Sequence, residues 1–140
     1  MTLQPVLDSL DKLTLVVTSL REGLAEPNRS DIVRSGIIKN FEFVYELSWK
    51  TIKRLLEYWG ITTGGPRDNL GKAFQEGLIQ NESVWLEILS DRNLTVHTYD
   101  KKLAREVSDR IAQNYMAEFE FLLQSLTKQV HSMKMPGSQP

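Results

Sequence analysis

A hydrophobic residue at every third or fourth position, kept up over the first 24 residues, is the feature that most constrains this fold. Such spacing puts all of these side chains on one side of an α-helix, where they must be buried together. Pro5 falls in the first turn of that helix, where a missing N–H costs little. The pattern predicts a long first helix that packs along one seam, formed by Leu3, Val6, Leu10, Leu13, Val17, Leu20 and Leu24.

The helical period continues through the rest of the chain. No alternation of period two and no Asn-Gly or Asp-Gly hairpin signal is present, so we expect an all-α fold. The expected architecture is an antiparallel, up-and-down bundle of four to five helices, with a short helix inserted at one end. Ser30 can cap a second helix at 31–59, which Gly60 ends, and a short helix at 67–76, with Leu70, Ala73 and Phe74 inward, ends at Gly77. Asn81 caps a fourth helix, and a last long helix runs from about Lys101 to Lys128.

Composition limits the class of protein. A chain of 140 residues, 41% hydrophobic and 25% charged, suits one helical domain, expected at residues 1–130, with a flexible C-terminal tail at 131–140. The absence of cysteine excludes disulfides, thiolate nucleophiles and zinc-thiolate sites. No apolar run is long enough for a membrane span, so we expect a cytoplasmic protein with no membrane partner. A formal charge of −1 means that any nucleic-acid site must be local.

One stretch, S-D-R-N-L-T-V-H-T-Y-D at residues 90–100, carries most of the chemistry: it holds Arg92, Asn93, His97 and Tyr99. An arginine is a permanent cation that can fork onto a phosphate, and a histidine exchanges a proton near neutral pH. RNA cleavage needs such a base for the 2′-hydroxyl proton, and a cation beside the phosphate to stabilise the developing charge. The stretch therefore predicts RNA cleavage by Arg92 and His97, with no metal and no cofactor.

The spacing limits how one chain assembles that site. Arg92 and His97 are five residues apart, about 140° around an ideal helix, so their side chains diverge. Asn93 and His97 are four apart and share a face, which lets the Asn93 amide hold the imidazole in one tautomer. Convergence of Arg92 and His97 requires a helix end or a second subunit. The motif is typical of a helix terminus that opens into a turn, and we expect a homodimer.

A purely structural role is the alternative interpretation for the charged residues of the motif and of the second helix. Lys39 with Glu42, and Glu46 with Lys50, have the spacing of surface salt bridges along the second helix. The sharper alternative is that one of the two carboxylates lines a dimer cleft. Singly, an arginine on a helix is usually solvated and a histidine near a helix end is usually a cap or a packed ring. Asp91 is expected only to balance neighbouring cations, as is Asp100.

Two blocks of sequence resemble a known family. Arg92-Asn93-Leu94-Thr95-Val96-His97-Thr98-Tyr99 resembles the Arg-polar-x-x-x-His-x-Tyr signature of the HEPN superfamily. The block F-E-F-V-Y-E-L-S-W-K at residues 41–50 is similar to the F-E-x-x-Y-E-L-x-W-K segment of its branch called nucleotidyltransferase substrate-binding proteins. Pro66-Arg67-Asp68, Gly77-Leu78-Ile79 and the run at 85–100 also fit, so the resemblance covers nearly all of residues 30–125.

The resemblance implies a HEPN-like, HepT-like toxin partnered with a minimal nucleotidyltransferase antitoxin. Such a toxin is a metal-independent ribonuclease, here expected to act on transfer RNA, with a composite cleft between two protomers. Arg92 and His97 correspond to its catalytic pair, and Tyr99 to the residue to which the antitoxin attaches AMP. The alternatives are a non-catalytic substrate-binding subunit of a nucleotidyltransferase and a plain helical interaction module.

Overall fold

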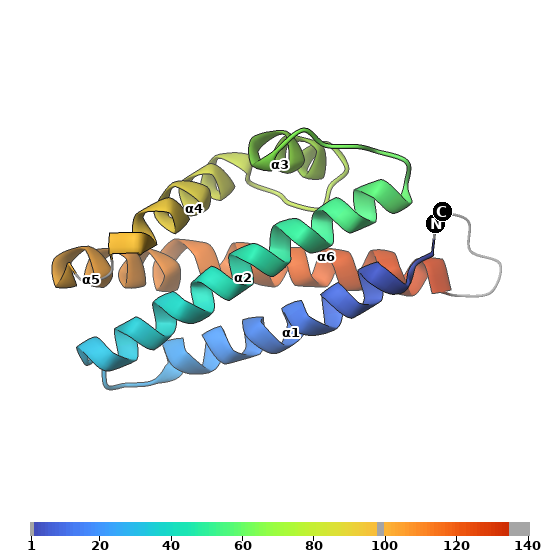
Figure 1. The fold of residues 1–140 in the computed structure, drawn as a ribbon. Helices are drawn as coiled ribbons and strands as arrows, with labels where there is room; N and C mark the ends of the chain where they lie inside the picture. The colour runs from blue at the N-terminus through green and yellow to red at the C-terminus, as the bar shows by residue number, and fades with distance from the viewer. Residues whose placement is uncertain (1, 98–99, 135–140) are drawn as a thin grey trace.

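Two long antiparallel helices form one side of the molecule in the computed structural model, which describes residues 2–97 and 100–134 (Figure 1). They are α1 (Gln4–Ala25) and α2 (Asp31–Tyr58). The Ser30 side chain accepts a hydrogen bond from the Val33 N–H at 3.2 Å, and so caps α2 as predicted. Gly60 follows α2 with a φ of +82°, a backbone conformation that glycine adopts without strain, which confirms the predicted stop.

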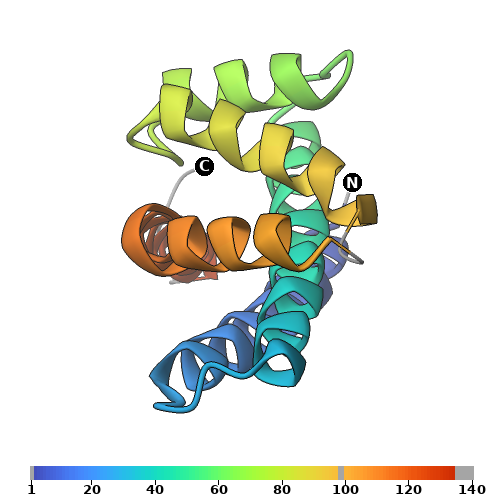
Figure 2. The same ribbon diagram turned by 90° about the vertical axis from the view of Figure 1, so that its left-hand side faces the viewer.

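Two shorter helices lie across α2 on the side away from α1 (Figures 1 and 2). These are α3 (Pro66–Gln75) and α4 (Glu82–Leu94). The Asn81 side chain caps α4 by accepting a hydrogen bond from the Val84 N–H at 3.3 Å, as predicted. One turn of 3₁₀-helix, η1 (Thr95–His97), continues from α4, so the helix does open into a turn within the motif, as expected.

The last part of the chain runs as one rod of three segments along the whole bundle (Figure 1). It consists of α5 (Lys101–Arg110), the π-helical turn η2 (Ile111–Tyr115) and α6 (Met116–Lys134). Asp100 caps this rod, because its Oδ1 accepts a hydrogen bond from the Leu103 N–H at 3.1 Å, so the expectation that Asp100 only balances neighbouring cations is wrong. The rod extends past its predicted end at Lys128 to Lys134, so the tail expected from residue 131 is helical at first. Residues 135–140 lie outside the described residues.

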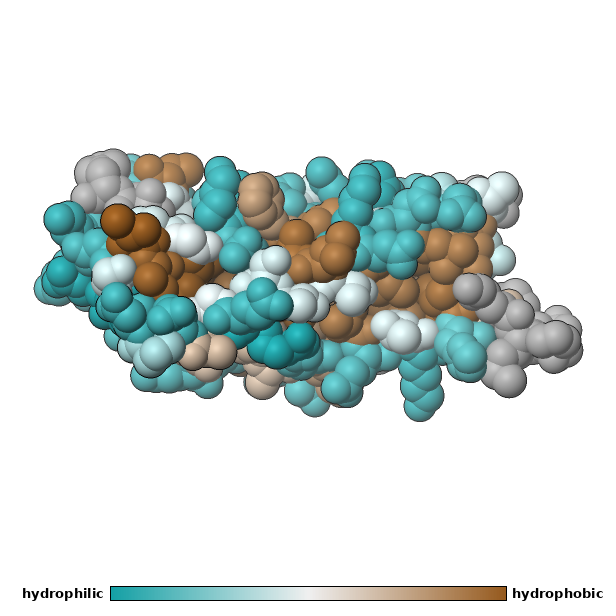
Figure 3. All heavy atoms as spheres, turned by 90° about the horizontal axis from the view of Figure 1, so that it is seen from below, coloured by the Kyte–Doolittle hydropathy of each residue, from teal (hydrophilic) through white to brown (hydrophobic). Residues whose placement is uncertain are grey.

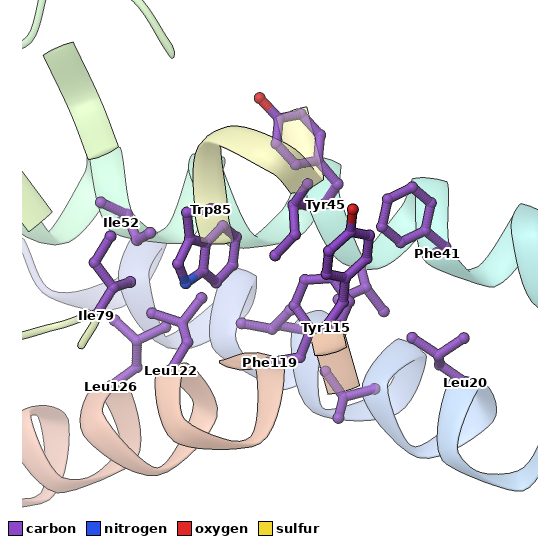
Figure 4. Close-up of a cluster of buried hydrophobic side chains, with 14 of the residues drawn as sticks. Leu20, Phe41, Tyr45, Ile52, Ile79, Trp85, Tyr115, Phe119, Leu122 and Leu126 are labelled. Atoms are coloured by element: carbon purple, nitrogen blue, oxygen red, sulfur yellow. The ribbon is translucent and has the colours of Figure 1, made fainter. Parts of the chain in front are cut away.

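Aromatic side chains from α2, α4, η2 and α6 meet in the core (Figure 4). The Phe41 ring stacks on that of Tyr115 with centroids 6.0 Å apart, and lies 6.1 Å from that of Phe119. The Trp85 ring meets Phe119 edge-on at 5.5 Å. Offset and edge-on arrangements of this kind are favourable for aromatic pairs. This cluster holds α4 and the last rod against the middle of α2.

The fold class is confirmed, because every regular element in the described residues is helical. Phe74 was expected to face inward but is 45% exposed. The buried side of α3 is narrow, since this short outer helix packs mainly against α2 and α4, and Asn69, Leu70 and Ala73 already fill it. Seen from below, apolar surface lies between hydrophilic side chains along the bundle (Figure 3). No helix in the described part is long and apolar enough to cross a membrane.

Candidate functional site

Arg92, near the C-terminal end of α4, lies against two carboxylates of α2. Its Nη1 is 3.4 Å from Glu42 Oε2, and its Nη2 is 3.6 Å from Glu46 Oε1. The prediction that these two glutamates form salt bridges with Lys39 and Lys50 of α2 is therefore wrong, since both glutamates pair with Arg92. Lys39 instead places its Nζ 5.4 Å from the centroid of the Phe43 ring. The Arg92 side chain remains 25% exposed, so solvent still reaches the ion pair.

Thr95 ties Arg92 to the start of η1. Its buried hydroxyl donates to the Arg92 carbonyl oxygen at 2.7 Å and accepts a hydrogen bond from Arg92 Nη1 at 3.3 Å. Glu42 Oε2 lies 3.3 Å from the same hydroxyl as a second acceptor. Because the backbone and the side chain of Arg92 both contact Thr95, the guanidinium has a defined position relative to η1, the turn that carries His97.

Glu46 has a second partner on its own helix. The Trp49 indole N–H donates to Glu46 Oε2 at 3.2 Å, so one carboxylate joins Arg92 to Trp49. Tyr45 is buried beside this group, with its hydroxyl directed away from the core side chains labelled in Figure 4. Burial raises the pKa of Tyr45, and the negative charge of Glu46 raises it further. Tyr45 is thus a neutral phenol at physiological pH.

Asp91 holds the last turn of α4 to the rod behind it. Its carboxylate is buried and accepts two hydrogen bonds from Arg110, at 2.7 Å from Nε and 2.8 Å from Nη2. The Tyr115 hydroxyl donates a third. The expectation that Asp91 only balances Arg92 and nearby lysines is wrong, because Asp91 points inward and pairs with α5 and η2.

Asp91, Arg110 and Tyr115 form one hydrogen-bonded group, the Asp91 cluster, in which the carboxylate shifts the pKa of both partners. Burial raises the pKa of Tyr115, and the hydrogen bond to Asp91 adds to that shift. The same carboxylate raises the pKa of Arg110 above its ordinary value. Tyr115 is therefore a neutral donor and Arg110 a permanent cation at any physiological pH. A π-helical turn carries one extra residue relative to an α-helix, and Tyr115 is the last residue of this turn.

Three consecutive residues of α4 thus face three surroundings. Successive residues of a helix are rotated by about 100°, so Asp91 faces the core and Arg92 faces α2. Asn93 is exposed and faces the loop before α3. His97 is exposed at the end of η1. Tyr99 lies outside the described residues.

Sequence reasoning missed the partners that position Arg92. Glu42, Glu46 and Thr95 contact it directly, and Arg110 and Tyr115 hold the residue before it. The one available signal was that Glu42 and Glu46 are four apart on one helical face, which suits a shared partner on another helix. Among residues 2–97 and 100–134, no group of three or more His, Asp or Glu side chains is arranged to hold a metal ion.

Comparison with known sequences matches nearly the whole chain to one family. The profile of the family described as nucleotidyltransferase substrate binding protein like matches residues 8–128. A Haemophilus influenzae protein named probable ribonuclease HepT is 41% identical over 101 residues, which cover 69% of this chain and 68% of that protein.

Solved structures show the same fold. A protein of Thermus thermophilus superposes with a TM-score of 0.73 at 29% identity, covering 81% of this chain and 98% of its own. A Haemophilus influenzae protein, reported to reveal the fold of a substrate binding domain of a nucleotidyltransferase, gives 0.68 at 33% identity, covering 90% and 99%. A mutant of the toxin-antitoxin pair MntA-HepT matches at 0.74 and 13% identity, covering 89% and 98%, which supports the fold alone.

The Asp91 cluster generates a stability prediction. We expect Asp91→Ala to lower the free energy of unfolding by on the order of 3 kcal/mol, since it leaves Arg110 and Tyr115 without their buried acceptor. Ser9→Ala is the matched control, because Ser9 makes a buried hydrogen bond to Thr51 on the α1 side of the bundle. Urea unfolding followed by circular dichroism measures both variants. Equal losses in the two would contradict a special role for the cluster.

Proposed function

This chain belongs to the nucleotidyltransferase substrate binding protein-like family, and from that premise we propose that it is the ribonuclease toxin of a toxin-antitoxin pair. The observation that carries the proposal is the position of Arg92, which α2 and Thr95 hold beside the turn that ends in an exposed His97. A cation and an imidazole are the two groups that metal-independent RNA cleavage needs. The name of the 41% identical relative, probable ribonuclease HepT, supports the same activity.

The reaction follows from the chemistry of these side chains. His97, acting as general base, accepts the proton of a ribose 2′-hydroxyl, whose oxygen attacks the neighbouring phosphorus. The phosphorus–O5′ bond breaks, and the leaving oxygen takes a proton from an acid such as a protonated His97 of a second protomer. Arg92 stabilises the charge on the phosphate oxygens. Asn93 is proposed to orient His97, and the expected RNA is a transfer RNA.

Arg92 retains capacity for a phosphate despite its two carboxylate partners. Among the described residues, its Nη1 meets Glu42 and Thr95 and its Nη2 meets Glu46, which leaves a second N–H on Nη2 for a phosphate oxygen. The two carboxylates also fix the plane of the guanidinium before RNA arrives, so less side-chain entropy is lost on binding.

A homodimer completes the proposed site. Exposed apolar side chains flank the paired residues in sequence: Phe43 follows Glu42, and Leu94 and Val96 enclose Thr95. Apolar surface of this kind beside a polar site is typical of an interaction surface. A second copy placed there brings its own Arg92 and His97, together with its own Glu42 and Glu46, so the composite site gains a second Arg-His pair and no excess of positive charge.

A non-catalytic substrate-binding subunit is the second candidate. One observation favours it: both carboxylates at Arg92 repel a phosphate, so the site in a single chain carries a net negative charge. The family description and the Haemophilus influenzae substrate binding domain agree with this alternative. RNA cleavage separates the two candidates.

The cleavage prediction uses purified protein, transfer RNA and chelator. We expect the wild type to cleave in chelator, and His97→Ala to lower the rate by about 10²- to 10⁴-fold. Arg92→Lys should lower the rate by about 10²- to 10³-fold, since lysine keeps the charge but loses the fork. Arg105→Ala, at an exposed arginine of α5, should cleave like the wild type. Cleavage that stops with chelator but survives in His97→Ala would point to a contaminating metal nuclease.

The dimer prediction is tested by light scattering at micromolar concentration. We expect a mass of two chains for the wild type and a shift toward one chain for Val96→Lys, which puts a charge into the proposed apolar interface. Leu15→Lys is the matched control, because Leu15 is similarly exposed on α1, 70% against 66% for Val96. A monomeric wild type would remove the composite site.

The partner is proposed to be a minimal nucleotidyltransferase that attaches AMP to Tyr99. The phenol oxygen attacks the α-phosphorus of ATP, pyrophosphate leaves and the phenol proton is released. The added phosphodiester is an anion and a competitor for Arg92, so cleavage stops.

Tyr99→Phe tests this modification. We expect the variant to cleave RNA like the wild type, gain no mass on incubation with the partner and ATP, and escape inhibition. Tyr58→Phe, at a half-buried tyrosine of α2, should be modified and inhibited normally. Intact-mass spectrometry measures the increment, and an unchanged increment in Tyr99→Phe would place the acceptor elsewhere.

A further inference from the structure

Two hollows share one rim beside the Arg92 site. The shared rim is the loop Gly64–Gly65–Pro66, which precedes α3. The first hollow, of about 210 Å³, lies between this loop and α2 and is lined also by Trp49, Lys53, Thr63 and Asn69. The second, of about 560 Å³, lies between the loop and α4 and is lined also by Arg67, Asp68, Leu89 and Asn93. One water occupies about 30 Å³ in the liquid, so each hollow has room for a group larger than a single water.

Trp49 connects the smaller hollow to the Arg92 site. Its indole N–H donates to Glu46, which pairs with Arg92, while its side chain lines the hollow. Asn93 lines the larger hollow and is the next residue of α4 after Arg92, on a neighbouring side of the helix. The smaller hollow is therefore joined to the Arg92 site through Trp49 and Glu46, and the larger hollow lies on the other side of the shared rim.

The polar groups around the rim suit a nucleotide. Lys53 and Arg67 place one cation on each side of the loop. Lys53 Nζ lies 3.8 Å from Glu57 Oε1, and Asp68, which also lines the larger hollow, pairs with Lys72 at 3.2 Å. Arg67 has no ion pair within residues 2–97 and 100–134, so its charge is available to a ligand. Asn69 is 1% exposed and its Oδ1 accepts no hydrogen bond from the described residues. A buried acceptor without a donor is uncommon. Asn69 also lines the smaller hollow, so a nucleobase N–H bound there can become its donor if the covered amide rotates toward the hollow.

We propose that these hollows bind a nucleotide of single-stranded RNA next to the scissile phosphate, with its base on the Trp49 indole and its backbone phosphate between Lys53 and Arg67. The proposal rests on the proposed ribonuclease function and names the substrate contact that this function lacks. Aromatic stacking beside a cationic groove is how proteins bind unpaired nucleotides without reading their sequence. A paired base does not expose its face to an indole, so the subsite selects unpaired RNA.

The chain's surface chemistry favours RNA over a protein partner here. The exposed apolar side chains Phe43, Leu94 and Val96 are not among the lining residues of either hollow, which are mainly polar, charged or glycine apart from Trp49, Pro66 and Leu89. With a formal charge of −1 for the whole chain, Arg67, which has no ion pair within the described residues, supplies the local positive charge that a phosphate needs.

The test measures binding without cleavage. A fluorescein-labelled single-stranded oligonucleotide carrying 2′-O-methyl groups lacks the attacking hydroxyl, so its affinity is measured by fluorescence anisotropy on intact protein. We expect Trp49→Leu to weaken binding by about 5- to 100-fold, the range for losing one stacked base. Trp49→Phe should bind within about threefold of the wild type, because it keeps a stacking ring. Both variants lose the N–H to Glu46, so their difference isolates stacking.

Matched controls separate the subsite from general charge and folding. Arg67→Ala should weaken binding, and Arg54→Ala, at an exposed arginine of α2 outside both hollows, should not. Trp59→Leu, at the C-terminal end of α2, should also bind normally. Circular dichroism melting shows whether each variant is folded. If Trp49→Leu does not fold, the test rests on Trp49→Phe and Arg67→Ala.

The outcomes distinguish this inference from the proposed function. Binding that depends on Trp49 in a protein that cuts no RNA supports the subsite and contradicts the nuclease. If the wild type cleaves RNA, and Trp49→Leu and Arg67→Ala bind the oligonucleotide as tightly as the wild type, the subsite is overturned and the proposed nuclease activity is not. Loss of binding to a partner nucleotidyltransferase, with oligonucleotide affinity unchanged in both variants, overturns the subsite in favour of protein docking.

Discussion

The buried carboxylate of Asp91 is the interaction on which the rest of the site depends. A buried charge without partners is costly, so α4 is stable only with Asp91 turned toward Arg110 and Tyr115. That orientation sets the rotation of the last turn of α4. Arg92, about 100° further around the helix, is thereby directed at α2. The π-helical turn that ends at Tyr115 belongs to the same constraint, because the phenol must stack on Phe41 and still reach Asp91.

Arg92 illustrates how an ion pair serves a site and limits it. Glu42 and Glu46 hold the guanidinium in one plane, which suits a group that must meet a phosphate with little rearrangement. The same carboxylates leave one excess negative charge around it, which opposes an anionic substrate in a single chain. A second copy brings the same two carboxylates with its own Arg92, so it does not remove this excess, whereas Arg67 at the Gly64–Gly65–Pro66 rim adds a positive charge. The balance between these charges is what separates a nuclease from a substrate-binding subunit with the same residues.

Three consecutive residues of α4 have different structural roles within the motif. Asp91 belongs to the core, Arg92 to the contact with α2 and Asn93 to the hollow beside the loop. A helix allows this division because consecutive side chains point in different directions while the backbone stays rigid. A site supported in this way changes little when its exposed residues are substituted, whereas substitution of Asp91 disturbs fold and site together.

Sequence patterns alone were enough to predict the all-α fold, the helix starts at Ser30 and Asn81 and the stops at Gly60 and Gly77. They also predicted that the helix carrying Arg92 opens into a turn before His97. These features depend on hydrophobic period and on capping, which act between residues close together in the chain. The packing of the helices, in contrast, was needed to show that Glu42 and Glu46 pair with Arg92, that Asp91 is buried against Arg110, that Phe74 is exposed, and that Asn93 faces the loop before α3. Each of these depends on which helices pack side by side and on their rotation, and contacts between distant residues leave no period in a single sequence.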